Sequence, residues 1–244
     1  NLAEENAQQS TWNRIGAGFD WIVVPTLSLR QAVSFDYIKG DEPGSYTKLV
    51  WTPGDPWKIT AEFDSFSLML PIRARAADIM AKRATFGVTR TPSDVREYGL
   101  GFATNLFSDR NRNYDMGAFF KQRVYNHPDV KVWAGLQGGY SRYTRQDVDY
   151  FSPMYVFSAT FAPIIHWIHY HYYDRFYRTS LYPRVGLTKQ YKYDFYPVGG
   201  LTLEQTLIWS KQFSITANVS YDLRVYDGVY SHVLGAYVGF KKYF

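Results

Sequence analysis

The chain has 244 residues and no cysteine, so the small folds that depend on disulfides are excluded. Its net charge of +5 is spread along the chain, which argues against a nucleic-acid-binding surface and leaves nucleic acid out of the expected partners. No apolar run approaches the roughly 18 residues that a membrane-spanning helix needs. What remains is one large β domain or two small ones, with aromatic side chains making up 19% of residues.

Apolar and polar residues alternate in chain order over long segments, the pattern of β-strands with one apolar and one polar face. The longest uninterrupted case is FSITANVSYDLRVY, which exceeds the usual strand length of about 5–6 residues and suits a bilayer crossing of roughly 9–11. We expect strands over residues 15–23, 27–37, 57–64, 83–89, 97–106, 114–124, 130–141, 213–226 and 234–240.

Turn residues separate these segments, as in the sequences GDEPG, PGDP, HPD and YDG. Strand and turn signals together predict an all-β, up-and-down antiparallel barrel with 14–16 strands and no helix. Residues 68–75 and 143–153 fit neither a strand nor a loop clearly, which leaves the strand count open within that range.

Strand number predicts which face is wet. A barrel of about eight strands is filled by its own side chains, whereas fourteen or more strands enclose a lumen too wide to fill. The apolar faces therefore point outward to lipid and the polar faces line a hydrated pore. Aromatic residues near strand ends fit interfacial girdles: Trp12, Trp21, Tyr37, Trp51, Trp57, Phe107, Tyr114, Tyr140, Trp209 and Tyr226. A soluble β-sandwich with these aromatics inside is the alternative.

The polar faces supply the candidate cargo-binding residues. Charges of both signs suit a hydrated, hydroxyl-rich polymer, carboxylates attract free amines, and inward rings such as Trp133 and Tyr237 can stack on sugar faces. The candidate pore-lining residues are Asp20, Arg30, Asp36, Glu62, Asp64, Arg83, Glu97, Asp115, Arg123, Trp133, Glu204, Asp222 and Arg224.

Two other constellations are weaker. His169 and His171 would share a strand face and could ligate zinc, but no third ligand is evident, so we expect no metal and no cofactor. Ser231 and His232 would suit an outer-membrane hydrolase, yet adjacent strand residues point to opposite faces. We therefore expect no enzyme activity and no catalytic residues.

Three motifs occur in order: LPIRARAADI at residues 70–79, GLGFATNLFSDRNRN at 99–113 and DYFSP at 149–153. Together they resemble the C-terminal porin domain of the exporters of poly-β-1,6-N-acetyl-D-glucosamine, a biofilm exopolysaccharide. The chain also resembles bacterial outer-membrane barrels in ending on an aromatic residue, Phe244. Lys242 departs from their pattern, in which this position is usually apolar. Residues that match the motifs are expected to hold turns and loops: Arg73, Phe107, Asp109, Tyr150 and Pro153.

The resemblance implies a bacterial outer-membrane barrel, favours sixteen strands and implies a partly deacetylated polysaccharide as cargo. It also implies an upstream periplasmic helical-repeat domain, so we expect residues 1–10 to be a linker and residues 11–244 to be the barrel. Other expected partners are the lipid bilayer and a periplasmic deacetylase or lipoprotein. The family's pore is expected to favour a cationic polymer through acidic walls, which the excess of lysine and arginine here does not match.

The sequence thus predicts a pore that exports a poly-N-acetylglucosamine-type exopolysaccharide through a hydrated lumen. The alternatives are an exporter of another polysaccharide, such as a cationic galactosamine-rich polymer or cellulose, a general sugar porin, and an outer-membrane hydrolase.

Overall fold

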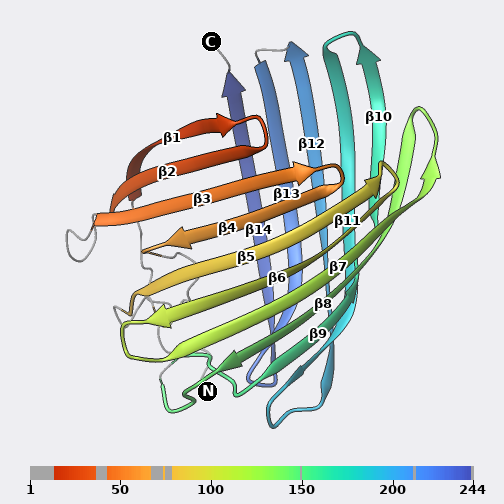
Figure 1. Cartoon of the computed structure of the whole chain (residues 1–244). Helices are drawn as coiled ribbons and strands as arrows, with labels where there is room; N and C mark the ends of the chain where they lie inside the picture. Colours follow the sequence, from red (N-terminus) through yellow and green to blue (C-terminus); the bar gives the residue numbers. More distant parts are fainter. Residues whose placement is uncertain are drawn as a thin grey trace. The chain divides into compact units, whose positions relative to one another are not determined.

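The computed structural model describes residues 14–36, 43–66, 74, 79–148, 150–210 and 213–242. The part of the chain that it describes contains fourteen strands in an antiparallel order (Figure 1). These are β1 (Arg14–Val24), β2 (Leu27–Asp36), β3 (Pro43–Gly54), β4 (Trp57–Asp64), β5 (Ala81–Ser93), β6 (Arg96–Phe107), β7 (Arg112–Asn126), β8 (Val130–Tyr143), β9 (Val156–Phe161), β10 (Ile164–Tyr172), β11 (Arg175–Gln190), β12 (Phe195–Ser210), β13 (Phe213–Tyr226) and β14 (Val229–Lys242).

The all-β prediction is confirmed, and the described strand number is the lower end of the predicted range. Of residues 143–153, which sequence patterns left unassigned, Tyr143 ends β8 and the others belong to the connection between β8 and β9, in which residue 149 lies outside the described residues. Of residues 68–75, all but Ala74 lie outside the described residues, as do the predicted linker at 1–10 and Trp12, Tyr37, Arg73 and Phe244. No helix among the described residues is long and apolar enough to cross a membrane.

β9 and β10 are two segments of one crossing, because both lie between β8 and β11 in the sheet order. The break falls at Ala162 and Pro163, and proline cannot donate a ladder hydrogen bond. Ala162 N–H donates instead to the Gly135 carbonyl at 2.8 Å. A Cβ on Gly135 would lie 2.4 Å from the Ala162 oxygen, so only glycine allows this close approach.

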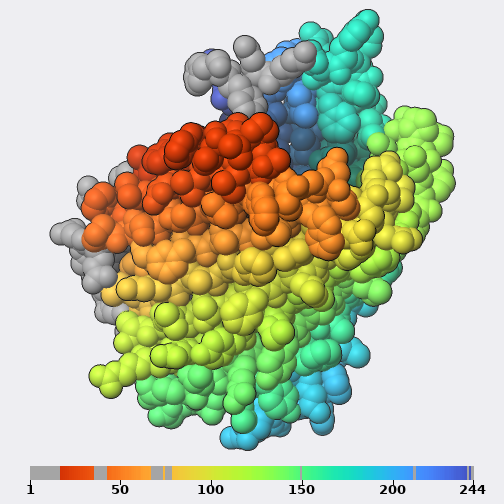
Figure 2. Space-filling view, in the orientation of Figure 1, coloured from red at the N-terminus to blue at the C-terminus, as the bar shows by residue number. Residues whose placement is uncertain are grey.

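The chain folds into two compact units. Unit 1 comprises residues 1–90, 100–116 and 141–155, and unit 2 comprises residues 91–99, 117–140 and 156–244. In unit 1 the strands from β1 to β4 form adjacent bands in the space-filling view (Figure 2).

Each unit has one polar and one apolar strand face, set by register. In unit 2, Val219 of β13 lies opposite Leu203 of β12 and Ala236 of β14. Val219 is 53% exposed and Leu203 41%. In unit 1 the apolar face carries Phe19, Trp21 and Val33, all exposed. An apolar surface that runs along whole strands needs lipid or another apolar layer to cover it.

A small apolar core lies in unit 1. It consists of Ala74, Ala81, Phe107 and Tyr150, with Ile79, Tyr143 and Val148 packed against it. The assignment of Phe107 to an aromatic girdle is therefore wrong, because that ring is only 6% exposed. Its place in the alternation of β6 explains the error, since Phe107 follows Asn105 and Ala103 on the face opposite Leu100, Phe102 and Leu106.

Other aromatic residues have the exposure that a girdle requires. Trp21, Trp51 and Trp57 lie beside the tight turns at residues 25–26 and 55–56, and they are 56%, 44% and 43% exposed. Val225, by contrast, is the last apolar residue in the alternation of β13, and its side chain is buried at 5% exposure. Gln190 donates a hydrogen bond to its carbonyl there, so the apolar face ends before β13 does.

The orientation of the two faces can be tested on adjacent residues of β13. We expect Val219→Arg to destabilise the membrane-inserted chain by about 2–4 kcal/mol, the cost of a base on the lipid face near the bilayer midplane. Ser220→Arg places the same charge on the polar face and serves as the matched control. Urea unfolding in lipid vesicles measures both, and equal losses would contradict the assignment of faces.

Candidate functional site

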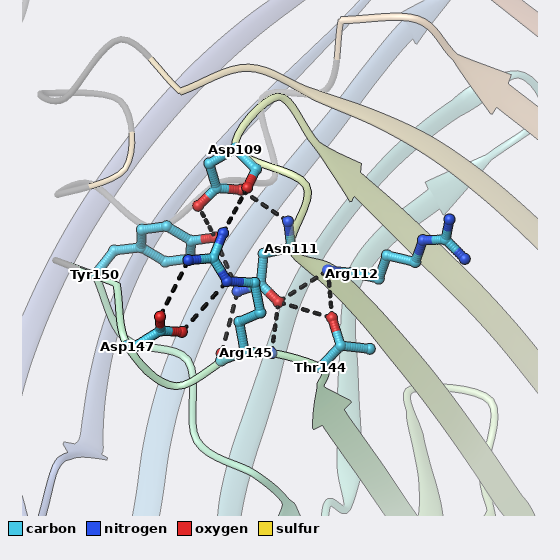
Figure 3. Close-up of polar contacts among 7 residues, drawn as sticks. All are labelled: Asp109, Asn111, Arg112, Thr144, Arg145, Asp147 and Tyr150. Atoms are coloured by element: carbon cyan, nitrogen blue, oxygen red, sulfur yellow. Dashed lines mark hydrogen bonds and ion pairs between the residues drawn. The ribbon is translucent and has the colours of Figure 1, made fainter.

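Two polar assemblies stand out, and the first joins two connections of unit 1. We call it the loop network, and Figure 3 shows its members: Asp109, Asn111, Arg112, Thr144, Arg145, Asp147 and Tyr150. The residues come from the β6–β7 connection with the start of β7, and from the β8–β9 connection. The two connections lie more than thirty residues apart in sequence, so tertiary packing and not local preference brings them together.

Asn111 is the centre of the loop network and is fully buried. Its amide nitrogen donates to the Tyr150 hydroxyl at 2.9 Å and to the Arg145 carbonyl at 3.2 Å. Its amide oxygen accepts from the backbone N–H groups of Arg112 (2.8 Å) and Arg145 (3.0 Å) and from the Thr144 hydroxyl (3.1 Å). One side chain thus satisfies polar groups of both connections, which is the requirement for burying irregular backbone.

Asp109 supplies the second link between the connections. The Tyr150 hydroxyl donates to its carboxylate at 3.0 Å, and Arg145 Nη1 donates to its carbonyl at 2.8 Å. Burial raises the pKa of the Tyr150 phenol; the Asn111 hydrogen bond opposes this and the Asp109 carboxylate reinforces it. The raised pKa keeps the phenol protonated at neutral pH, so it remains a donor to Asp109.

Arg145 also holds Asp147 at the exposed edge of the network. Its Nε and Nη2 donate to the two carboxylate oxygens of Asp147 at 3.3 and 3.1 Å. These bonds lower the pKa of the Asp147 carboxyl and raise that of Arg145. Because both groups are solvent-exposed, this pair contributes little to stability.

The loop network joins two of the three sequence motifs. Phe107 and Asp109 belong to the motif at residues 99–113 and Tyr150 to the one at 149–153, and the Phe107 and Tyr150 rings stack with centroids 5.4 Å apart. The structure thus places these residues where a role in holding loops requires them.

The second assembly is the polar face of the strands, which carries the predicted pore-lining residues. In unit 1, Arg30 forms two hydrogen bonds to Asp20, at 2.5 and 2.7 Å. Glu62 lies 2.6 Å from Lys48, and Arg83 lies 3.6 Å from Asp115. Asp64 lies opposite Arg83 in the β4–β5 register. Asp36 ends β2, and its side chain lies outside the described residues.

Hydrogen-bonding amides extend this face in unit 1. Arg83 donates to Asn105 at 3.1 Å, Asn105 to Asn113 at 2.7 Å, and Asn113 to the Ser141 hydroxyl at 2.7 Å. Sequence reasoning missed these residues because it looked for charges. Their signal was present, since Asn105 and Asn113 occupy polar positions of alternating strands.

In unit 2, Glu97 lies 2.7 Å from Lys121, and Arg123 lies 2.5 Å from Asp94 and above the Trp133 ring. Glu204 lies 3.8 Å from Arg178 and accepts a hydrogen bond from Tyr182. Trp133 lies two residues after Lys131 in β8, so both side chains point to the polar face. The register pairs Trp133 with Ile164 and Lys131 with His166 of β10. Tyr237 lies opposite Asn218, also on the polar side.

In unit 2 a close ion pair joins β11 to β13 across β12, the strand between them. Arg184 of β11 and Asp222 of β13 both lie opposite Gly200 of β12, and Arg184 bonds to Asp222 directly across it. A Cβ on Gly200 would meet the Asp222 carboxylate at 2.2 Å, so glycine is what leaves room for the pair. Arg224 approaches the second Asp222 oxygen at 3.2 Å. The predicted residues Asp222 and Arg224 are therefore brought together.

The histidines do not form the predicted pair. Between Ile168 and Tyr170 the register with β11 shifts, so His169 is an extra residue in β10. His169 contacts Thr179 at 2.8 Å, whereas His171 packs on Phe176. Thr179 and Phe176 lie on opposite faces, so the expectation that His169 and His171 share a face is wrong. Within the described ranges, no group of three metal-ligating side chains occurs.

Ser231 and His232 are separated as expected. His232 contacts the Tyr221 hydroxyl at 2.6 Å, and Ser231 lies opposite Arg224. Leu223, the residue opposite His232, belongs to the apolar face. This geometry does not place the imidazole where it could accept the Ser231 proton.

Comparisons with known proteins agree with this architecture. Residues 4–241 match the family model described as the PgaA membrane β-barrel domain. Proteins named poly-β-1,6-N-acetyl-D-glucosamine export protein, from Escherichia coli K12 and from E. coli O157:H7, are each 24% identical over 203 residues. Those matches cover 83% of this chain, which spans only 25% of the length of either relative.

A solved structure titled bacterial polysaccharide outer membrane secretin superposes with a TM-score of 0.90 at 21% identity. The superposition covers 96% of this chain and 80% of the other. At this identity the match establishes the fold.

The role of the loop network can be tested through its central residue. We expect Asn111→Ala to lower the free energy of unfolding by about 3 kcal/mol, because it removes all the hydrogen bonds of a fully buried amide and takes away the acceptor of the Arg145 backbone N–H. Gln146→Ala, in the β8–β9 connection that Asn111 contacts but exposed, is the control and should change stability by less than about 0.5 kcal/mol. Denaturant titration of both variants in detergent gives the comparison, and a neutral Asn111→Ala would show that the connections are held by other contacts.

Proposed function

Because this chain belongs to the family of PgaA membrane β-barrel domains, we propose that it forms an outer-membrane pore that exports a biofilm exopolysaccharide of the poly-N-acetylglucosamine type. The observation that carries the proposal is the pairing of the two strand faces: an exposed apolar face that needs lipid, and a polar face of paired charges and amides that suits water and hydroxyl-rich cargo.

The mechanism is passive guidance. Charges already paired across neighbouring strands offer hydrogen bonds without presenting one strong field, so a polymer can exchange contacts as it moves. The driving force comes from synthesis at the inner membrane. The pore itself performs no catalysis in this proposal, and Ser231 and His232 take no part in the transfer.

Other parts of the proposal concern partners. We propose that a periplasmic helical-repeat domain and a periplasmic deacetylase or lipoprotein act before the pore. Support comes from the sequence motifs and from the length of the relatives, of which this chain spans 25%.

Deletion of the gene in its native host tests the export role. We expect surface polysaccharide to disappear while the polymer continues to be made and accumulates inside the cell. Complementation with the Ser231→Ala or His232→Ala variant should restore the surface polymer fully, which separates a pore from a hydrolase. Surface polymer that persists after deletion would refute export by this protein.

Connection lengths support an orientation of the pore. Successive strands alternate in direction, so the connections of unit 1 fall into two sets: the short turns 25–26 and 55–56 in one, and the longer connections 37–42, 65–80, 108–111 and 144–155 in the other. Outer-membrane barrels have short periplasmic turns and longer extracellular loops. We therefore propose that the second set, with the loop network, faces the cell exterior.

The absence of cysteine makes this orientation directly testable. We expect Gln146→Cys, in the connection 144–155, to react with a membrane-impermeant maleimide in intact cells. Thr26→Cys, exposed in a short turn of the same unit, should react only after the outer membrane is permeabilised. The reverse pattern would invert the proposed orientation.

A further inference from the structure

An aromatic cluster lies on the polar face of unit 2, consisting of Trp133 of β8, His166 of β10 and Tyr182 of β11. The His166 ring lies edge-on to both neighbours, with its centroid 5.1 Å from Trp133 and 6.1 Å from Tyr182. The three rings thus form a row across neighbouring strands, and each of them is partly exposed.

Hydrogen bonds fix the orientation of the row. His166 Nδ1 and the Ser180 hydroxyl are 2.7 Å apart, and Tyr182 donates to Glu204 at 3.3 Å. Arg123 lies over the Trp133 ring, 5.9 Å from its centroid. Rings held in this way lose little conformational freedom when a ligand packs on them, which favours binding.

The charges around the cluster are more often basic than acidic. Lys121, Lys131 and Arg178 are close enough to act on His166 electrostatically. The bases on this face of unit 2 are Lys121, Arg123, Lys131, Arg178, Arg184 and Arg224, against the strand acids Glu97, Glu204 and Asp222 and the turn residue Asp94, which pairs with Arg123. A ligand carrying a free ammonium group would meet net repulsion here.

From these observations we propose that Trp133, His166 and Tyr182 form a stacking subsite for N-acetylated sugar units, in preference to deacetylated ones. This inference rests on the proposed export function. A pyranose ring has an apolar face of C–H groups that can cover an aromatic ring. A neutral acetamido group avoids the repulsion that an ammonium group would meet, and its carbonyl oxygen accepts hydrogen bonds from the surrounding bases.

In a partly deacetylated polymer, the two kinds of sugar unit would bind at different places on the polar faces. Acetylated units would pause on the cluster, whereas deacetylated units would find their partners at carboxylates elsewhere on the polar faces. In unit 1, for example, bases and acids on this face occur as matched pairs such as Arg30 with Asp20 and Lys48 with Glu62.

Calorimetric titration of the purified chain in detergent tests the subsite, with β-1,6-linked hexamers of N-acetylglucosamine and of glucosamine as probes. We expect the wild-type chain to bind the acetylated hexamer about fivefold or more tightly than the deacetylated one. Trp133→Ala should weaken binding of the acetylated hexamer about tenfold, and Trp133→Phe should restore most of it.

Trp167→Ala is the matched control, because Trp167 neighbours His166 in β10 but is 40% exposed on the apolar face, opposite Thr179. It should leave both affinities unchanged. Equal or tighter binding of the glucosamine hexamer, an unchanged affinity in Trp133→Ala, or no binding of either hexamer would overturn the subsite. Complementation of export in the deletion strain is scored separately. Wild-type export without the binding preference rejects only the subsite, whereas failed wild-type export rejects the pore function.

Discussion

The rest of this structure depends on one constraint, the need of every backbone amide in a bilayer for a hydrogen-bond partner within the protein. Strands meet that need only by pairing with neighbours on both sides. Pairing in turn fixes the alternation of side chains, because residues opposite one another share a face. The row from Leu203 through Val219 to Ala236 and the parallel row from Gly200 to Asp222 are consequences of the same ladder. Lipid-facing and polar surfaces are therefore two outcomes of one hydrogen-bond pattern.

Backbone groups leave the strand hydrogen-bond ladder where another group nearby can take their hydrogen bonds. Pro163 breaks the crossing between β9 and β10, and the Ala162 amide finds the Gly135 carbonyl instead. The irregular connections have no strand neighbours, so their buried polar groups need other hydrogen-bond partners. The Asn111 amide is such a partner for groups of two connections. Irregular backbone is stable here because a buried side chain takes over the role that strand pairing has elsewhere.

Periodicity predicted nine of the fourteen described strands, since alternation is a local property that a single sequence displays, but it gave no ranges for β3 or for β9 to β12. It predicted that Asp222 and Arg224 share a face. Arg184, the other base that pairs with Asp222, lies 38 residues from it along the chain, and only the register reveals that pair. His169 shows the opposite limit. One extra residue in β10 reverses the face of everything after it, and nothing in the local pattern marks that position. Phe107 ends β6, as a girdle residue would, but its alternation with the exposed Leu106 places it on the opposite, buried face.

The loop network could not have been derived from spacing. Asp109 and Tyr150 are joined by a hydrogen bond across 41 residues, and isolated polar residues in two loops carry no periodic signal. Motif order pointed to both loops, but only the packing of Phe107 on Tyr150 shows that the motifs contact each other.

The charge balance of the polar face links sequence to selectivity. The excess of lysine and arginine in the sequence does not match a partly cationic cargo. The structure accounts for part of this mismatch, because carboxylates on nearby strands pair with many of the bases and offset their charge. A paired base contributes a hydrogen-bond donor and little net field, so the wall can contact hydroxyl and acetamido groups without strongly repelling an occasional amine. Where bases exceed acids, around Trp133 and His166, rings rather than carboxylates fill the surface, and there the neutral units of a mixed polymer are the ones that fit.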